Sequence, residues 1–353
     1  MQDATGEDWI ENARMIVDSA GAIVPADGSL ARVRAVRFEG PGYDRAIMAE
    51  AGALGLFQMR VGAEAGGLGL GLRETCELAR VLGRGLLPEP VLPAIMAAAL
   101  LQENLPGAAL AGEQVLTWAW QDAPGRLDWT GGVKDGRLHG RKHAVQGAAG
   151  ADLFVVVTGA GLALLPRDAV TVEAGDTLDG GKLCSIAFDT DADLLPCTAT
   201  QSVIEDATLV HSAYLLGLSG RALEITLDYL RIRRQFDRPI GSFQALQHRA
   251  TEMKVGLELS RAAIFATARR FDMGGDPLSR ARAAARVKLR AAQLAMHVSR
   301  EAIQMHGAIG ITDEADIGLV QGGIAGSRPE SNVKSLAGLY FEPLWVFERS
   351  GLE

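Results

Sequence analysis

The chain has 353 residues, of which 48% are hydrophobic and 22% are charged, and this composition predicts one large soluble domain or two to three small ones. Its formal net charge of −8 argues against a nucleic-acid-binding protein, because such a protein needs a concentrated basic surface. We also expect no membrane partner, since the longest apolar run is too short to span a bilayer and the acidic first residues do not resemble a signal peptide.

The three cysteines, Cys76, Cys184 and Cys197, show no metal-ligand spacing and leave one thiol without a possible partner. This pattern is typical of reduced thiols in the cytoplasm. We therefore expect a cytoplasmic protein without a metal site.

Three zones follow one another along the chain. Residues 1–112 are rich in Ala, Leu and Glu at helical spacing, residues 113–200 consist of short β-rich runs separated by Gly and Asp, and residues 201–353 return to long helical patterns. Within the middle zone, Asp135-Gly136 lies between two β-rich runs and predicts a hairpin. The sequence therefore predicts an α+β fold in the order helical domain, β domain, helical bundle.

The last zone contains signals for several helices. Apolar residues recur at alternating steps of four and three from Leu209 to Leu230, and again from Phe243 to Leu257, and each series predicts one amphipathic helix. Asp276-Pro277 predicts the start of a third helix, because Asp caps a helix and Pro suits its first position. Gly307 is suited to a left-handed C-terminal cap and predicts the end of that helix.

A charged segment, "RRQFDRPIGSFQALQHR", connects the first two of these helices at Arg233–Arg249. Arg233 offers a planar fork of donors that suits a phosphate, and Phe236 could pack on a planar base. The N–H groups of a helix that begins near Gly241-Ser242 would favour an anion. The residues alone leave two interpretations open: a site for a flat anionic ligand, or an ordinary helix–loop–helix corner with solvated arginines.

The same segment resembles the signature R-x-Q-F-G-R-x-I-x-x-F-Q-x-x-Q of the acyl-CoA dehydrogenase family. "AIQMHGAIGITDEADIG" at Ala302–Gly318 is similar to the family's Q-x-x-G-G-x-G-(F/I)-T-x-E, and Ala65–Pro90 resembles its N-terminal segment. "GRKHAVQGAAGADLFVVV" resembles a segment of the family's β domain. These stretches occur in the family's order, so the resemblance implies its fold: an N-terminal helical domain, a middle β-barrel domain and a C-terminal domain of four-helix-bundle type.

The resemblance implies FAD as the cofactor and assigns residues to it by position. The residues that fall where the family contacts the adenosine diphosphate part of FAD are Arg233, Gln235, Phe236, Ile240 and Phe243. The residues that fall where the neighbouring subunit closes over the same cofactor are Gln304, Gly307 and Ala308. The resemblance also implies an acyl-CoA substrate, an electron-transfer flavoprotein as electron acceptor, and a homodimer or homotetramer.

Members of the family use a carboxylate to remove the proton alpha to the thioester carbonyl, while a beta hydride passes to the flavin. One family position for this base falls on Ala207, which cannot accept a proton, and the adjacent Asp206 is expected to face another side of the helix. The other position falls on Ser331, and a one-residue gap would put Glu330 there. Glu330 is therefore the candidate base, with a solvated loop acid as the alternative.

Three stretches depart from the family pattern. The flavin-contact motif is degraded at Trp118–Asp128, and His143–Ala148 replaces the stretch that shields the flavin. Trp118 and Trp120 could flank the flavin edge or fill the β domain, and we expect the second. After Gly318, closely spaced glycines and Pro329 predict that the family's regular helix is broken.

The first functional hypothesis is FAD-dependent alpha,beta-dehydrogenation of an acyl-CoA thioester in the beta-oxidation of fatty acids or steroid side chains. The alternative is a catalytically incomplete subunit that shares an FAD site with a homologous chain in a hetero-oligomer, and Ala207 favours it. A third hypothesis, a folded scaffold without cofactor, is disfavoured by the intact set Arg233, Gln235 and Phe236.

Overall fold

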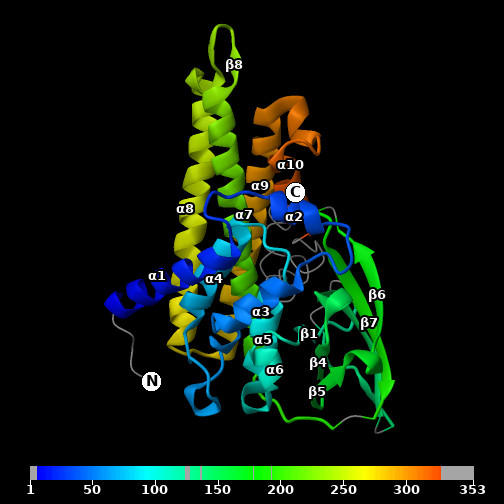
Figure 1. The fold of residues 1–353 in the computed structure, drawn as a ribbon. Helices are drawn as coiled ribbons and strands as arrows, with labels where there is room; N and C mark the ends of the chain where they lie inside the picture. Colours follow the sequence, from blue (N-terminus) through cyan, green and yellow to red (C-terminus); the bar gives the residue numbers. More distant parts are fainter. Residues whose placement is uncertain (1–5, 124–127, 136, 178, 192, 327–353) are drawn as a thin grey trace, which may run out of the picture.

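The structure is a computed structural model that describes residues 6–123, 128–135, 137–177, 179–191 and 193–326. The first part of the chain is helical (Figure 1). Its helices are α1 (Gly6–Ile23), α2 (Ala31–Val36), α3 (Arg45–Ala53), α4 (Leu72–Arg84), α5 (Val91–Leu101) and α6 (Gly107–Leu110). Helix α5 is apolar on every side, "VLPAIMAAALL", and is accordingly buried, between the first strand and the long helix α7.

The middle of the chain forms two sheets. One has the strand order β1 (Leu116–Ala119), β4 (Leu153–Thr158), β5 (Gly161–Pro166), and the other has the order β2 (Val133–Lys134), β3 (Arg137–Gln146), β7 (Lys182–Thr190), β6 (Thr171–Asp176). Among the described strands only β1 and β4 pair in parallel, so these sheets are not of the doubly wound type. The predicted hairpin is confirmed by the pairing of Lys134 with Arg137; Asp135 has a φ of 52°, and Gly136 lies outside the described residues.

The last part is a bundle of helices: α7 (Thr200–Ile232), α8 (Gln244–Asp272), α9 (Pro277–His306) and α10 (Asp316–Gly326). A short hairpin of β8 (Arg234–Gln235) and β9 (Arg238–Pro239) joins α7 to α8 and projects from one end of the molecule (Figure 1). The predicted third helix is confirmed at both ends. The Asp276 carboxylate accepts the N–H of Ser279, and the chain leaves the helix at Gly307 with a φ of 68°.

The expectation of a broken helix after Gly318 is wrong for the residues that the structure describes. Helix α10 runs through Gly322 and Gly323 to Gly326. A Cβ at Gly323 would lie 2.3 Å from Cδ1 of Leu86, so a side chain there would require the Leu86 side chain to move. This contact favours glycine at position 323, although glycine has a low helix propensity. Pro329 lies outside the described residues.

The α+β order of helices, sheets and helices is confirmed. One hydrophobic cluster runs without interruption through all three regions, from Ile16 on α1 to Ile324 on α10. The three cysteines are free thiols, of which Cys76 and Cys184 are buried. Over the described ranges, the structure contains no helix with the length and apolar character needed to cross a bilayer.

Candidate active site

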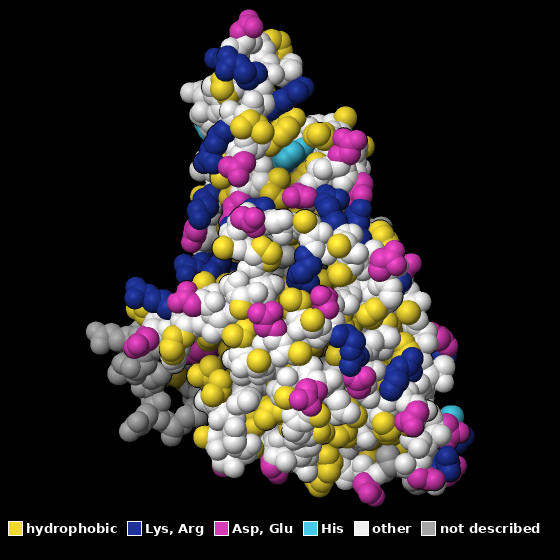
Figure 2. Space-filling model, viewed as in Figure 1, with side chains coloured by type: hydrophobic (Ala, Val, Ile, Leu, Met, Phe, Trp, Pro, Cys, Tyr) yellow, Lys and Arg dark blue, Asp and Glu magenta, His cyan; other side chains and the backbone are white. Residues whose placement is uncertain are grey.

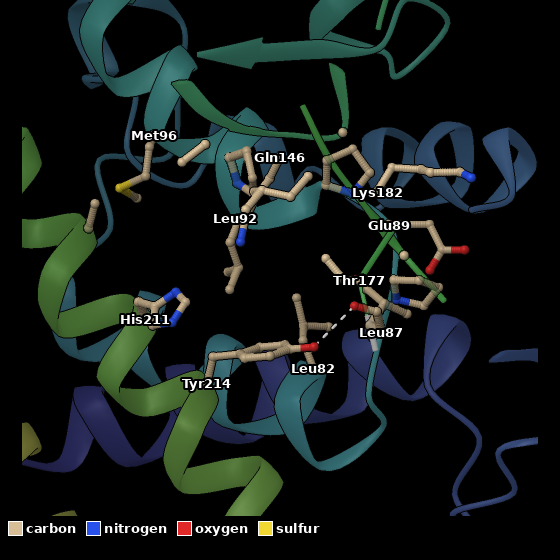
Figure 3. Close-up of a pocket in the computed structure, with 18 of the residues that line it drawn as sticks. Leu82, Leu87, Glu89, Leu92, Met96, Gln146, Thr177, Lys182, His211 and Tyr214 are labelled. Carbon is tan, nitrogen blue, oxygen red and sulfur yellow. Dashed lines mark hydrogen bonds between the residues drawn. The ribbon is translucent and has the colours of Figure 1, made fainter. Parts of the chain in front are cut away.

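A cavity of about 280 Å³ lies where the helical regions and the sheets meet. The residues that line it come from the link before α5, from α5 itself, from the sheets and from α7 and α9. They include Leu86, Leu87, Glu89, Leu92, Met96, Trp118, Trp120, Gln121, His143, Gln146, Thr177, Asp179, Lys182, Ala207, His211, Tyr214 and Lys288. Leu92 and Met96 of α5 face this cavity (Figure 3). Together with Trp118 on β1 and Trp120 just beyond it, they make this a place where an organic group can be held away from water.

Helix α7 gives the cavity one wall. Ala207, His211 and Tyr214 follow one another at steps of four and three, so they lie on the same face of the helix. Figure 3 shows the rings of His211 and Tyr214 on this wall, opposite Leu92. The Tyr214 hydroxyl donates to the carbonyl of Leu87 at 3.3 Å, and burial raises its pKa far above the ordinary value. Tyr214 therefore stays neutral and fixes α7 to the link before α5.

Both carboxylates among the described lining residues are engaged elsewhere. The Glu89 carboxylate accepts hydrogen bonds from both terminal nitrogens of Arg32 and, at 3.1 Å, from the N–H of Asp44. Asp179 accepts the hydroxyl of Thr177 and, at 3.3 Å, the N–H of Gly181. Each of these carboxylates is therefore already bound by donors of this chain.

Asp206, next to Ala207 on α7, does not line the cavity. Its carboxylate accepts from Arg60 at 2.6 Å and from Arg280 at 2.8 Å. Burial raises the pKa of Asp206, and the two guanidinium groups act against that rise. Asp206 thus ties α7 to α9 and to the segment after α3. The other candidate base position, with Glu330 and Ser331, lies outside the described residues.

Trp118 and Trp120 pack against the hydrophobic core, as expected, and also line the cavity. Both side chains are half-buried and line the cavity, with ring centroids 6.0 Å apart. Thr117 and Ala119 alternate with them and are buried, because successive residues of an extended strand point to opposite sides. His143, from the stretch that departs from the family pattern, also lines the cavity, and its Nδ1 lies 3.0 Å from the Ser185 hydroxyl.

The segment that follows α7 forms an exposed hairpin. Phe236 and Asp237 have φ values of 52° and 63°, as the tight turn between β8 and β9 requires. The ring of Phe236 is 84% exposed and meets that of Phe243 edge-on, with centroids 6.1 Å apart. The guanidinium of Arg238 lies 4.1 Å from the centroid of the Phe243 ring. Helix α8 begins only at Gln244, slightly later than expected, after a single 3-10 turn at Ile240–Ser242.

The arginines of this hairpin are exposed, and Figure 2 shows basic side chains gathered on the projecting tip. The second expected FAD segment lies at the same end of the bundle. Its residues Gln304, Gly307 and Ala308 are exposed at the end of α9, where the Tyr229 hydroxyl of α7 donates to the carbonyl of His306 at 3.3 Å. The structure therefore brings the two expected FAD segments to one end of the bundle.

The cavity lies far from this end. At about 1.5 Å per residue, the Cα atoms of Ala207 and Arg233 are about 39 Å apart along α7. The sequence analysis did not single out His211, Tyr214 or Lys288 as cavity residues. The first two could have been found from their helical spacing to Ala207, whereas Lys288 comes from another helix.

Two segments of the chain match models of a known protein family. Residues 11–103 match the family model described as acyl-CoA dehydrogenase, N-terminal domain, and residues 198–322 match the model of the acyl-CoA dehydrogenase C-terminal domain. The acyl-CoA dehydrogenase IpdE2 of Mycolicibacterium smegmatis is 39% identical over 119 residues, which are 34% of this chain and 36% of that protein. The aligned segment thus spans about a third of that relative.

Two solved structures share the fold over nearly their whole length. A steroid ACAD, Tcur3481-Tcur3483 in a G363A variant, has a TM-score of 0.79 at 24% identity, with 96% of this chain and 99% of that one covered. The ChsE4-ChsE5 complex from Mycobacterium tuberculosis has a TM-score of 0.78 at 22% identity, with both chains fully covered. At these identities the likeness establishes the fold alone.

Proposed function

The chain belongs to the acyl-CoA dehydrogenase family, and we propose that it is an FAD-binding subunit that catalyses the alpha,beta-dehydrogenation of an acyl-CoA thioester. The observation that carries the proposal is the pairing of an exposed basic and aromatic hairpin with an enclosed cavity about 39 Å away on the same helix. The hairpin has the chemistry for a dinucleotide, and the cavity has the chemistry for an acyl group.

The hairpin residues fit the adenosine diphosphate part of FAD. Arg233 presents a guanidinium fork suited to the pyrophosphate, and the exposed ring of Phe236 offers a face for the adenine. The N–H of Arg233 already donates to the carbonyl of Tyr229 at 2.9 Å, so its side chain starts from a fixed backbone. A planar ligand that covers the Phe236 ring would also remove its apolar surface from water.

One FAD molecule cannot bridge the hairpin and the cavity of the same chain, because an extended FAD is shorter than about 39 Å of helix. The hairpin would therefore serve a flavin bound at the cavity of a second subunit. In a homodimer or homotetramer, the hairpin of each chain would contact the flavin at the cavity of the other chain. A two-fold axis repeats this contact, so every hairpin and every cavity would be occupied.

Within the cavity, bound FAD would supply a two-electron acceptor for the beta hydride. The residues of this chain would hold the acyl group between the Trp118–Trp120 pair and α7, with Leu92 and Met96 as apolar contacts. A dry wall of this kind strengthens hydrogen bonds to the thioester carbonyl and excludes water from the reacting carbons. Glu330 remains the proposed base, and an electron-transfer flavoprotein remains the proposed electron acceptor.

The substrate class that we propose is a fatty-acyl or steroid side-chain CoA thioester, handled in the cytoplasm. One of the solved structures of the same fold is named a steroid ACAD, which supports the second source.

A second function is favoured by one observation. Ala207 lies on the cavity wall, at the family's base position on α7, and both described carboxylates of the cavity are engaged with other groups. A subunit without a base would still donate its hairpin to the flavin of a homologous chain. The ChsE4-ChsE5 structure is named as a complex of two chains with this fold. The alternative is therefore a catalytically incomplete partner in a hetero-oligomer.

The protein purified alone tests both functions. We expect a yellow oligomer with FAD bound and measurable oxidation of acyl-CoA by an artificial electron acceptor. A colourless protein that binds FAD only after co-expression with a homologous chain would support the second function. A protein that takes up FAD neither alone nor with such a chain would contradict both.

A further inference from the structure

The ends of α7 and α9 are joined by two stacked rings. The rings of Tyr229 and His306 have centroids 4.4 Å apart and planes inclined by 24°. The Tyr229 hydroxyl donates to the carbonyl of His306 at 3.3 Å. Nδ1 of His306 lies 2.7 Å from the carbonyl of Ala302, and because a carbonyl can only accept, this contact puts a proton on Nδ1.

This pair adjoins both segments expected to bind FAD. Tyr229 lies one turn before Arg233, and its carbonyl accepts the Arg233 N–H. His306 is the last residue of α9, directly before Gly307 and Ala308. The contact between Tyr229 and His306 therefore links the end of α7 that precedes the hairpin to the exposed end of α9.

Several other charged groups near this end form ion pairs within the chain. Arg249 of α8 forms an ion pair with Glu301 of α9, and Asp313 and Asp316 beyond His306 accept from Arg34 and Arg37 of the α2 region. Burial lowers the pKa of His306, and the hydrogen bond to Ala302 opposes this only in part. His306 is therefore neutral near pH 7, and its protonation would put an unpaired charge into a buried contact.

We propose that Tyr229 and His306 are a positioning pair: their stack holds the end of α9, with Gln304, Gly307 and Ala308, against the end of α7 that leads into the hairpin, and protonation of His306 loosens that arrangement. The functional half of this inference rests on the proposed FAD site, whereas the structural half does not. Neither residue is assigned a contact with the substrate.

The lowered pKa of His306 determines how pH changes the stability of the Tyr229–His306 contact. A histidine in contact with water has a pKa of about 6.5, and His306 stacked on Tyr229, the docked state, has a lower pKa. The docked state is thus fully stable above about pH 6.5. It loses stability as the pH falls below that value, until the pKa of the docked His306 is reached. One released proton changes the docking equilibrium by at most about tenfold per pH unit.

Hydrogen exchange tests the structural half without FAD. We expect the protection factors of residues 304–312 in the wild type to fall between pH 7.5 and pH 5.5, by up to about tenfold per unit. His306→Gln keeps a side-chain N–H donor but cannot titrate, so its protection factors should not change with pH. Tyr229→Leu removes the stack and should be poorly protected at both values. The same fall with pH in wild type and His306→Gln would overturn the inference.

FAD affinity at the same pH values tests the functional half. The dissociation constant of the wild type should rise on acidification, that of His306→Gln should not, and His139→Gln, an exposed histidine on β3, should behave like the wild type. Circular dichroism at each pH separates this effect from unfolding. Exchange that responds to His306 while FAD affinity does not would overturn the link to the cofactor. If no version binds FAD but exchange follows the expectation, the proposed function fails and the positioning role stands.

Discussion

Ala207 and His211 lie one turn apart on α7 and line the same cavity. The methyl group of Ala207 therefore lies on this cavity wall, at the position that the family resemblance predicts for the base. If the proposed chemistry takes place here, α7 does not supply its acid from this position.

Replacing Ala207 by Glu should create a base. The side chain would enter the cavity beside His211, and removal from water would raise the pKa of its carboxyl toward the working pH. General-base catalysis contributes about 10²–10⁴-fold, so we expect an increase in acyl-CoA turnover of that order. The measurement is kcat with an artificial electron acceptor, compared with Ala207→Gln as an isosteric control. Equal rates in the two variants would contradict a reacting thioester beside α7.

Replacing Arg233 by Ala should weaken FAD binding by about 1.5–3 kcal/mol, the scale of a charge-assisted hydrogen bond. This corresponds to an increase of about 10- to 150-fold in the dissociation constant. Arg231→Ala is the matched control, because Arg231 is equally exposed two residues earlier but pairs with Asp228 on α7. Flavin titration of both variants checks the prediction. A loss shared equally by the two would indicate a general charge effect and not a site at Arg233.

The isolated, FAD-loaded chain should oxidise acyl-CoA slowly. Ala207 cannot accept a proton, and the two described carboxylates of the cavity are engaged by Arg32 and by the segment at Thr177. Any remaining turnover should depend on Glu330, so Glu330→Gln should abolish it while FAD content stays unchanged. Fast turnover by the homomeric protein that survives Glu330→Gln would contradict both the partner-subunit hypothesis and Glu330 as base.

The overall order of helices, sheets and helices could be predicted because local signals agree with the final packing. Asp276-Pro277 and Gly307 bound a helix in the sequence and in the structure, since caps act through their immediate neighbours. The glycines of α10 misled the prediction for the opposite reason. Gly323 packs against Leu86, more than 200 residues earlier, and local propensity contains no information about this contact.

The two parts of the candidate site also differ in how much of them the sequence predicts. The hairpin at Arg233 lies within one continuous motif, so its residues could be identified from the sequence. The cavity instead assembles side chains from β1, α5, α7 and α9, and Lys288 and Trp118 come together only through the fold. The position of Trp118 on the cavity could not be predicted, because a four-residue strand gives no indication of which face meets the helices.

The ion pairs around Asp206 give the last prediction. Its carboxylate accepts from Arg60 at 2.6 Å and from Arg280 at 2.8 Å, with only about a tenth of the side chain exposed. Asp206→Asn would remove the nearer counter-charge from two largely buried guanidinium groups, although Arg280 keeps its ion pair with Glu205 at 3.2 Å and Arg60 lies 3.9 Å from Asp272. Removing one partner of a fully buried pair costs about 3–5 kcal/mol, and the remaining pairs reduce that cost. Because both arginines keep some contact with water, we expect a loss of about 2–4 kcal/mol in the free energy of unfolding. Asp228→Asn, which breaks an exposed pair with Arg231 on the same helix, should cost less than about 1 kcal/mol. Urea unfolding at pH 7 measures both. Equal stability of the two variants would mean that the Asp206 pairs do not hold α7 to its neighbours.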